Sequence, residues 1–340
     1  MFTGCASHVP YDVLDRHLSG NDCQAAIDLM AAHESDYGEN DALLFHLDSA
    51  MVQMECRDFN GAQKHFRAAE DLAEQLYTLS LSREAISFVT NEYVLAYPGE
   101  DFERAMIHLM SALTFLDEGQ PREALVECRR LDSLLTLFND KYDSKNVYRE
   151  DAFARYLSGI LREADNDVSG AFIDYKKAVE TYQDYEKNYG TGMPRDLGPD
   201  LFRAARKTGR VMDAMEVLTG YGDFFHEKTP PGSGQVVWIQ LAGKMPPKKE
   251  DRVMVPTTHG PLTIAFPKFA PQDPPGIAPV FCLRSQTGQT IEKKGALVSD
   301  LSAIARAAAK QGVIHQIAKN DNKETQKTVE NVFKYFKYPG

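Results

Sequence analysis

Small and large apolar residues recur at fixed intervals along the first two-thirds of the chain. A short signature that ends in alanine occurs at Asp58–Ala62, Gln120–Ala124 and Asp167–Ala171. In each copy a small residue lies twelve positions before the alanine, and further packing residues lie four and seven positions after it. The four places are filled by Ala50/Ala62/Phe66/Ala69, Ala112/Ala124/Cys128/Leu131 and Gly159/Ala171/Tyr175/Ala178. Spacings of four and seven keep side chains on one helix face, so the pattern predicts pairs of packed helices.

The repetition predicts an array of helix-turn-helix units. Small residues at facing positions let two antiparallel helices approach closely, and neighbouring hairpins must stack because one hairpin cannot bury its apolar face alone. Weaker copies at Ala26 with Met30 and at Ala214 with Leu218 flank the three clear ones. The signature alanines are 36, 62, 47 and 43 residues apart, and only the first spacing approaches the roughly 34 residues of a tetratricopeptide (TPR) repeat. The longer gaps predict inserted helices or loops, including a helix over residues 75–88. The alternative is an ordinary helical bundle with coincidental alanine spacing.

The pattern changes after Tyr221, where turn residues and short β-rich runs replace the helical periodicity. We therefore expect a mostly α chain: a TPR-like helical-hairpin solenoid, a small β-rich module and a C-terminal helix. The predicted boundaries are 1–9 for an N-terminal segment, 10–222 for the solenoid, 223–296 for the β module, and 297–340 for the C-terminal helix and polar tail. The predicted strands of the β module are Gln235–Leu241, Leu262–Phe266 and Ala278–Leu283.

Composition narrows the range of functions. The net charge of −11 at pH 7 argues against nucleic-acid binding, because no basic stripe is available to neutralise phosphates. No apolar run approaches the ~20 residues that span a bilayer. The chain contains no G-x-S-x-G, H-E-x-x-H, P-loop or G-x-G-x-x-G motif. The sequence therefore predicts a protein that is not an enzyme and that needs no cofactor and no metal.

The cysteines show no metal-ligand spacing. Cys128 occupies the helix position filled by Phe66 and Tyr175 in the sister repeats, which predicts a buried thiol. Cys23 and Cys56 also fall within helical pattern, and an oxidising compartment would permit disulfides that the sequence does not require.

The N-terminal Phe2-Thr3-Gly4-Cys5, followed by Ala6-Ser7, has the residues of a bacterial lipoprotein cleavage box, in which Cys5 becomes the lipidated first residue. The charged and apolar regions of a signal peptide are missing from the sequence. The alternative is a free cysteine near the terminus.

A longer stretch extends this likeness to a family. The segment Tyr97–His108, which contains Gly-Glu-Asp-Phe-Glu-Arg, runs into Ser111–Leu116. It resembles the "G-E-x-F-E-R" helix of a poorly characterised family of bacterial outer-membrane lipoproteins with TPR-like repeats and no assigned chemistry. Asp151–Gly159 and Ala171–Ala178 resemble later repeats of that family, and Gly260–Pro267 resembles its strand ending in "I-A-x-P". The resemblance implies a periplasmic protein anchored to the outer membrane, with the lipid on Cys5 as its only membrane contact.

The first helices of the hairpins carry apolar residues beyond those needed for packing within each hairpin. In a TPR-like stack these helices line the inner, concave side. Methionine and aromatic side chains there would suit an amphipathic helix or an extended peptide. The predicted partner groove comprises Leu47, Met51, Met54, Leu109, Leu113, Phe153, Tyr156 and Ile160. The alternative is that these side chains pack against an inserted helix or against the chain's own C-terminal part.

These observations favour a non-enzymatic, lipid-anchored scaffold that binds protein partners of a cell-envelope assembly. The alternative is a structural subunit that self-assembles into a ring or a filament, as part of an envelope machine or an extracellular appendage. A third hypothesis is an enzyme with a site around Lys248 and His259 in the β segment. His46, His65 and His108 are expected on repeat helices, partly buried or at a solvated edge, and not as ligands.

Overall fold

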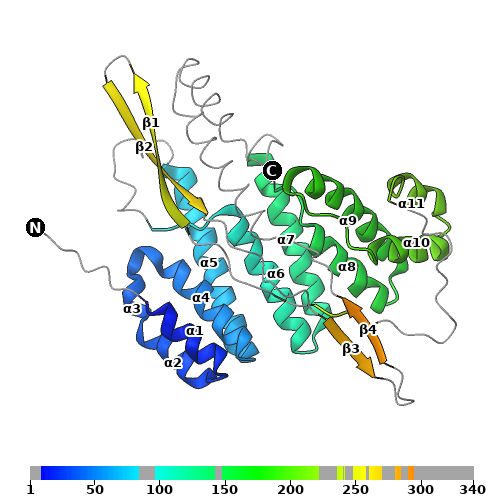
Figure 1. Cartoon of the computed structure of the whole chain (residues 1–340), viewed down its shortest axis with the longest axis horizontal. Coiled ribbons are helices and arrows are strands. Elements are labelled where there is room, and N and C mark those ends of the chain that lie inside the picture. Colours follow the sequence, from blue (N-terminus) through cyan, green and yellow to red (C-terminus); the bar gives the residue numbers. More distant parts are fainter. Residues whose placement is uncertain are drawn as a thin grey trace, which may run out of the picture. The chain divides into compact units, whose positions relative to one another are not determined.

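The computed structural model describes residues 9–83, 96–141, 148–221, 236–239, 241, 248–257, 260–269, 280–284 and 290–294. Five helical hairpins follow one another in this described part (Figure 1). They are α1 (Tyr11–Ser19) with α2 (Cys23–Ala32), α4 (Ala42–Glu55) with α5 (Phe59–Arg83), α6 (Asp101–Asp117) with α7 (Pro121–Lys141), α8 (Ala152–Ala164) with α9 (Val168–Tyr189), and α10 (Leu197–Thr208) with α11 (Val211–Val217). The short helix α3 (Glu34–Tyr37) and a 3-10 turn (Glu39–Asp41) join the first two hairpins.

All five hairpins turn with the same backbone conformation. A residue with positive φ lies five positions before the signature alanine of each hairpin, at Asn21, Arg57, Gly119, Asn166 and Gly209. The residue after it donates its backbone N–H to a carbonyl five positions earlier, as from Asp58 to Gln53 and from Asp167 to Arg162. This combination is a Schellman motif, which ends a helix by satisfying its last carbonyls. The first and last copies share the motif, so the two weak sequence copies are full members of the array.

The aspartate and glycine of the signature start the second helix. Asp58 Oδ1 accepts a hydrogen bond from the Gly61 amide at 3.1 Å, and Asp167 Oδ1 accepts one from the Gly170 amide at 2.9 Å. A Cβ atom at either glycine would collide with the aspartate that caps it. In these two copies the signature is therefore an N-cap that satisfies an otherwise unpaired amide of the first turn, whereas the Gln120–Ala124 copy has neither the aspartate nor the glycine.

The predicted packing positions form the cores of the hairpins. The signature alanines are all fully buried, at Ala26, Ala62, Ala124, Ala171 and Ala214. The large residues that follow them in the three clear copies are also buried, at Phe66, Cys128 and Tyr175. A Cβ atom at Gly159 would collide with the Tyr175 ring, which shows how closely α8 approaches α9. The helical-hairpin prediction is confirmed, and the described helices form TPR-like hairpins.

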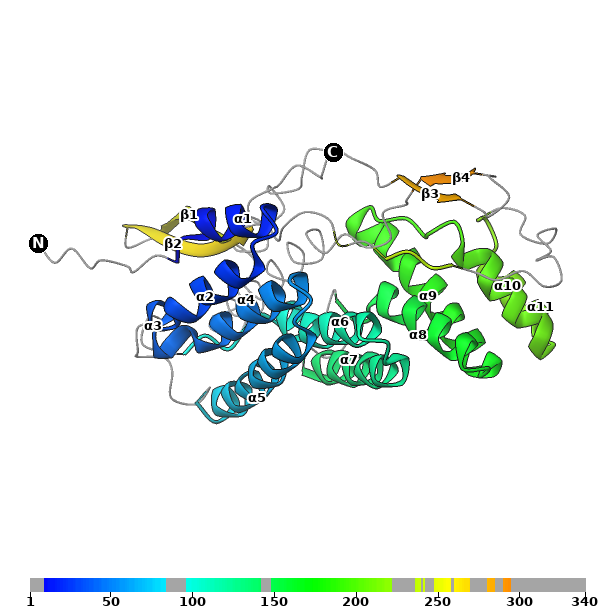
Figure 2. The same ribbon diagram turned by 90° about the horizontal axis from the view of Figure 1, so that it is seen from below.

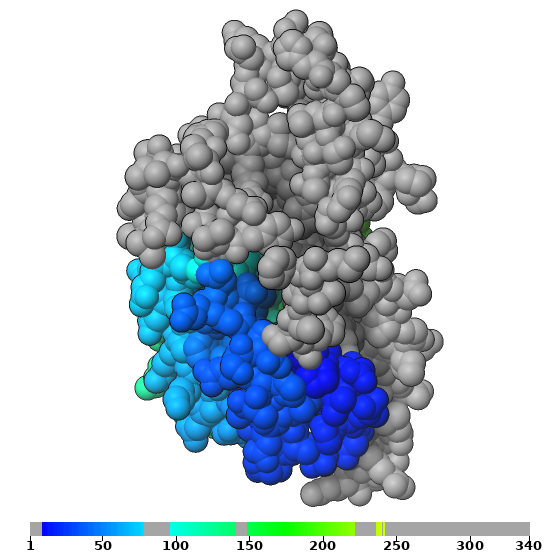
Figure 3. All heavy atoms as spheres, turned by 90° about the vertical axis from the view of Figure 1, so that its left-hand side faces the viewer, coloured from blue at the N-terminus to red at the C-terminus, as the bar shows by residue number. Residues whose placement is uncertain are grey.

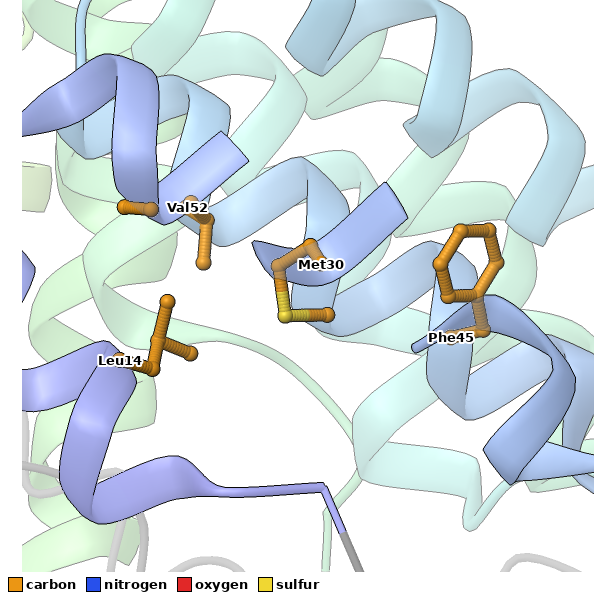
Figure 4. Close-up of a cluster of buried hydrophobic side chains, with 5 residues drawn as sticks. Leu14, Met30, Phe45 and Val52 are labelled. Carbon is orange, nitrogen blue, oxygen red and sulfur yellow. The ribbon is translucent and has the colours of Figure 1, made fainter. Parts of the chain in front are cut away.

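The first two hairpins share one apolar cluster (Figure 4). Leu14 of α1, Met30 of α2, and Phe45 and Val52 of α4 point into it. A disulfide between Cys23 and Cys56 joins α2 to the end of α4, with their Cα atoms 5.3 Å apart. Non-covalent packing and a covalent bond therefore hold the first hairpin against the second.

The residues just before and at the start of α6 form a helix cap. Gly99 has a φ of +77°, and a Cβ atom there would lie 2.9 Å from Leu43 Cδ2. Glu100 and Glu103 form a capping box, in which the Glu100 amide donates to Glu103 Oε2 at 2.8 Å. The Tyr97 hydroxyl also donates to Glu103. This segment therefore fixes where α6 begins.

Long second helices account for much of the irregular repeat spacing. α5, α7 and α9 contain 25, 21 and 22 residues (Figure 2). The helical stretch predicted over residues 75–88 is helical as far as residue 83, but these residues continue α5 without a break and are not an inserted helix. Residues 84–88 lie outside the described residues.

The chain divides into two compact units, residues 1–137 and 138–340. In the first unit, the side chains of α1 to α5, coloured from dark blue to cyan, lie next to one another on the face shown in Figure 3. In the second unit, α10 packs against α9, so the fourth and fifth hairpins are stacked. Among the described residues, no helix combines the length and the apolar character needed to cross a membrane.

The strands form two separate antiparallel pairs. β1 (Lys248–Thr257) pairs with β2 (Gly260–Phe269), and β3 (Val280–Arg284) pairs with β4 (Thr290–Lys294). The predicted strand Leu262–Phe266 lies within β2, and the described part of Ala278–Leu283 lies in β3.

Because the strands form two separate pairs, the described residues do not support the single β module predicted for residues 223–296. The predicted strand Gln235–Leu241 is wrong where it is described, because residues 236–239 and 241 have no regular structure. The helix and tail predicted for residues 297–340 lie outside the described residues, as do residues 1–8 of the N-terminal segment.

Candidate functional site

The predicted partner groove draws its residues from three first helices, α4, α6 and α8. Four of its residues are buried, namely Met54, Leu109, Leu113 and Tyr156, with exposed fractions of 8%, 1%, 5% and 9%. The structure corrects the groove prediction at these four positions, because a buried side chain offers no surface to a partner. They act as core residues instead.

Tyr156 shows why sequence periodicity misplaced these residues. Its hydroxyl donates a 2.7 Å hydrogen bond to Asp200 Oδ2 of α10, and its ring packs edge-on against Tyr175 at a centroid distance of 5.9 Å. Burial, followed by the negative charge of Asp200, raises the pKa of Tyr156 well above its usual value. This side chain therefore joins the fourth hairpin to the fifth.

A charged network continues from Asp200. Arg203 pairs with Asp200 at 2.7 Å and donates two hydrogen bonds to the carboxylate of Glu163, at 2.9 and 2.7 Å. The Tyr175 hydroxyl donates to the same carboxylate at 3.0 Å. Although burial acts to raise it, the pKa of Glu163 is held below its usual value by Arg203 and Tyr175. These carboxylates are already hydrogen-bonded, so the network is a stacking contact between hairpins rather than a reactive centre.

The remaining groove residues stay accessible in part. Leu47 and Met51 lie one turn apart on α4, where Leu47 is half-buried and Met51 is 40% exposed. Phe153 and Ile160 on α8 are half-buried. The candidate docking surface therefore shrinks to one small apolar patch in each compact unit: Leu47/Met51 in the first and Phe153/Ile160 in the second.

The first unit also concentrates negative charge. Residues 9–60 contain eleven aspartates and glutamates but only two arginines, and so carry most of the chain's net charge of −11.

One of these carboxylates, Asp48, is shared by two tyrosines: the Tyr11 and Tyr37 hydroxyls each donate to Asp48 Oδ2 at 2.7 Å. Burial is the main cause that raises the pKa of Tyr11 to about 12. This contact links α1, α3 and α4.

Two histidines meet inside the second hairpin. The Nδ1 atoms of His46 on α4 and His65 on α5 lie 2.9 Å apart. Burial lowers the pKa of both imidazoles. The sequence predicted both histidines on repeat helices but did not predict their contact. Their offsets from the packing residues carried the signal, since His46 precedes Ala50 by four positions and His65 follows Ala62 by three.

A second histidine contact lies in the third hairpin. His108 Nδ1 is 2.8 Å from Glu127 Oε2, and Arg130 pairs with both Glu127 and Glu70, at 3.2 and 3.0 Å. These charges join α5, α6 and α7. His108 is buried, in keeping with its expected place on a repeat helix.

Over the described ranges, no group of three or more His, Cys, Asp or Glu side chains is arranged to hold a metal ion. His259, invoked for the enzyme hypothesis, lies outside the described residues, and Lys248 is described only as the first residue of β1.

Cys128 is buried, as the repeat register predicted. The Cys23–Cys56 disulfide is a bond that the sequence permitted without requiring. Cys5, the predicted lipidation site, lies outside the described residues.

Known proteins were compared with the chain at the level of sequence and of structure. No protein-family model matches it, and no curated protein sequence matches it. The crystal structure of BtubC (BKLC) from P. vanneervenii is similar at 13% identity and a TM-score of 0.40, over 67% of this chain and 85% of that one. A Podosopora anserina putative kinesin light chain with nearly identical TPR-like repeats is similar at 15% identity and a TM-score of 0.33, over 61% and 89%. The assignment of the repeats therefore rests on the hairpin geometry of the chain itself.

Proposed function

We propose that this chain is a non-enzymatic scaffold that binds protein partners of a cell-envelope assembly through its TPR-like hairpins. The observation that carries the proposal is the five-fold recurrence of one hairpin, with the same turn and the same buried alanine, in the described residues. Stacked hairpins of this kind build extended surfaces for binding proteins and peptides.

The proposed compartment is the periplasm, with a lipid on Cys5 that anchors the chain to the outer membrane. The Cys23–Cys56 disulfide supports this part of the proposal, because such bonds persist in oxidising compartments and are rare where thiols are kept reduced. The lipoprotein-like residues before Cys5 and the resemblance around Tyr97–Leu116 supply the remaining support.

Mass spectrometry and fractionation test the anchor. The protein is produced in its native host from its own gene, and the mass of the peptide that contains Cys5 is measured in each membrane fraction. We expect a diacylglyceryl adduct on Cys5 in the outer-membrane fraction and a soluble protein for the Cys5→Ala variant. An unmodified cysteine in a soluble wild-type protein would overturn the anchor and leave the scaffold proposal to be tested separately.

Site-specific photo-cross-linking tests the binding surface. A photoreactive residue at Met51, which is 40% exposed, is compared with one at Ile173 on α9, which is 47% exposed. We expect a discrete adduct with an envelope protein from position 51 and none from position 173. The Met51→Glu substitution should weaken binding of that protein while leaving helicity unchanged.

Equal adducts from both positions, or full binding by a folded Met51→Glu variant, would remove the Leu47/Met51 patch from the proposal. Adducts formed only between copies of this chain, together with a mass in solution that grows with concentration, would favour the self-assembling subunit instead.

A further inference from the structure

Three hairpins of the described chain place polar side chains at the same two facing positions. One lies four residues before the small residue of the first helix, and the other lies three residues after the buried alanine of the second. The pairs are His46 with His65, His108 with Glu127, and Arg155 with Asp174, and their closest polar atoms lie 2.9, 2.8 and 3.6 Å apart. The third and fourth hairpins thus pair a base with an acid, whereas the second pairs two bases.

Two imidazoles can share a hydrogen bond in only some protonation states. A contact between two Nδ1 atoms requires one ring to donate its N–H and the other to accept with a lone pair. When both rings are protonated, both Nδ1 atoms are donors and two positive charges face each other at short range, so the contact cannot persist. In the His108–Glu127 pair, proton uptake by the imidazole instead creates an ion pair.

The surroundings of the histidine pair disfavour a second positive charge, that is, protonation of both imidazoles. The Phe45 ring lies against both imidazoles, at centroid distances of 5.3 Å from His46 and 5.7 Å from His65. Burial lowers the pKa of both rings, and His46 and Lys64 lower that of His65 further. Glu34 of α3 acts in the opposite direction on both rings, and Asp58 at the start of α5 does so on His65. Since the pKa of each ring is lowered, burial outweighs these carboxylates.

We propose that the His46–His65 contact is a proton-sensitive latch between α4 and α5, which holds while at most one ring is charged and opens when both are. The unfolded chain takes up these protons near pH 6.5 and the folded chain only at lower pH. The contribution of the latch is therefore complete above pH 6.5 and is lost as the pH falls below that value.

The repeat itself supplies a matched variant. His65→Glu gives the second hairpin the acid–base pair of the third. Histidine NMR titration and denaturant unfolding at pH 7.5 and 5.5, with a chelator present, compare this variant with the wild type, His46→Gln and His65→Gln. In the wild type we expect both rings to titrate below pH 6.5 and the hydrogen exchange of α4 and α5 to rise at pH 5.5. Each ring changes the unfolding equilibrium constant by at most about tenfold per pH unit.

The single variants distinguish two histidines that titrate as a coupled pair from two histidines that are merely buried. Removing His46 should raise the titration midpoint of His65, because one source of repulsion is gone. His65→Glu should abolish the acid-induced rise in hydrogen exchange over α4 and α5. The proposal is overturned if the two rings titrate independently, if acid leaves α4 and α5 as protected as at pH 7.5, or if the His65→Glu variant loosens as the wild type does. Protection by added zinc in the absence of chelator, without any coupling between the titrations, would indicate a metal site in place of the latch.

Discussion

The Tyr156 hydroxyl donates a 2.7 Å hydrogen bond to Asp200 Oδ2 and thereby ties α8 to α10 across two successive hairpins. Asp200 is 1% exposed and also receives Arg203. A residue that the sequence assigned to partner binding is therefore part of the internal stacking of the array.

Tyr156→Phe tests the contribution of this bond while retaining the ring. The variant leaves a buried carboxylate short of one donor, and we expect the free energy of unfolding to fall by about 1–3 kcal/mol, measured by urea denaturation. Tyr11→Phe is the control, because Tyr11 is 44% exposed and Asp48 keeps its bond from Tyr37; its effect should stay within about 0.5 kcal/mol. Equal stability of Tyr156→Phe and the wild type would mean that ring packing alone joins the two hairpins.

Gly159→Ala tests the close approach of α8 and α9. The added methyl group would collide with the Tyr175 ring, and displacing this buried ring should cost about 1–3 kcal/mol, despite the higher helix propensity of alanine. Gly192→Ala is the matched control, because no atom lies within 4 Å of the corresponding Cβ position. Thermal unfolding of both variants gives the comparison. A Gly159→Ala variant more stable than the wild type would show that the helices can separate at little cost.

Reduction of the Cys23–Cys56 bond should destabilise the first unit. The bond closes a loop across a sequence separation of 33 residues, and its loss should lower the free energy of unfolding by about 2–4 kcal/mol. Denaturation with and without reductant should show this loss in the wild type and in Cys128→Ala. The Cys23→Ala/Cys56→Ala double variant should not respond to reductant. Peptide mapping under non-reducing conditions that found both thiols free would refute the bond.

Glu163 should make the second unit sensitive to acid. Its pKa is lowered in the folded state, so its contribution is present above the ordinary carboxyl value near 4.5 and is lost as the pH falls through the folded value. Between pH 6 and pH 3 the wild type should therefore lose more stability than Glu163→Gln. The exposed Glu180, paired with Lys176 at 3.8 Å, offers a control, since Glu180→Gln should follow the wild-type slope. Parallel slopes for all three proteins would contradict the assigned role of Arg203.

Much of the fold could be read from the sequence because its causes are local. The Schellman turn, the Asp cap and the buried alanine each depend on residues within about two helical turns; the alanine spacing predicted the buried positions, whereas the turn and the cap were recognised only in the structure. The same reasoning placed Cys128 in the core, because a position in a repeat has the same neighbours in every copy. The helical stretch from residue 75 was taken for an inserted helix although it continues α5 as far as residue 83, because periodicity alone does not say where one helix ends.

The surface was harder to predict than the hairpins. Met51 and Tyr156 both lie on first helices among apolar neighbours, yet one is 40% exposed and the other 9%. The difference lies in Asp200, which is 44 residues from Tyr156 in the sequence and which no helical period connects to it. The contact between His46 and His65 is closer to the sequence, because their offsets from Ala50 and Ala62 recur in the next two hairpins, but the contact itself depends on how two helices face each other.

The sequence by itself determined the hairpins, their turns and the residues buried between paired helices, because these follow from helical periodicity and capping. Only the tertiary structure decided which side chains the stacked hairpins cover, that Cys23 meets Cys56, and that two histidines occupy a place held by an acid and a base in the next hairpin. These outcomes depend on distances between segments that are far apart in the chain, and hydrophobic patterning specifies that such segments pack without specifying which atoms meet.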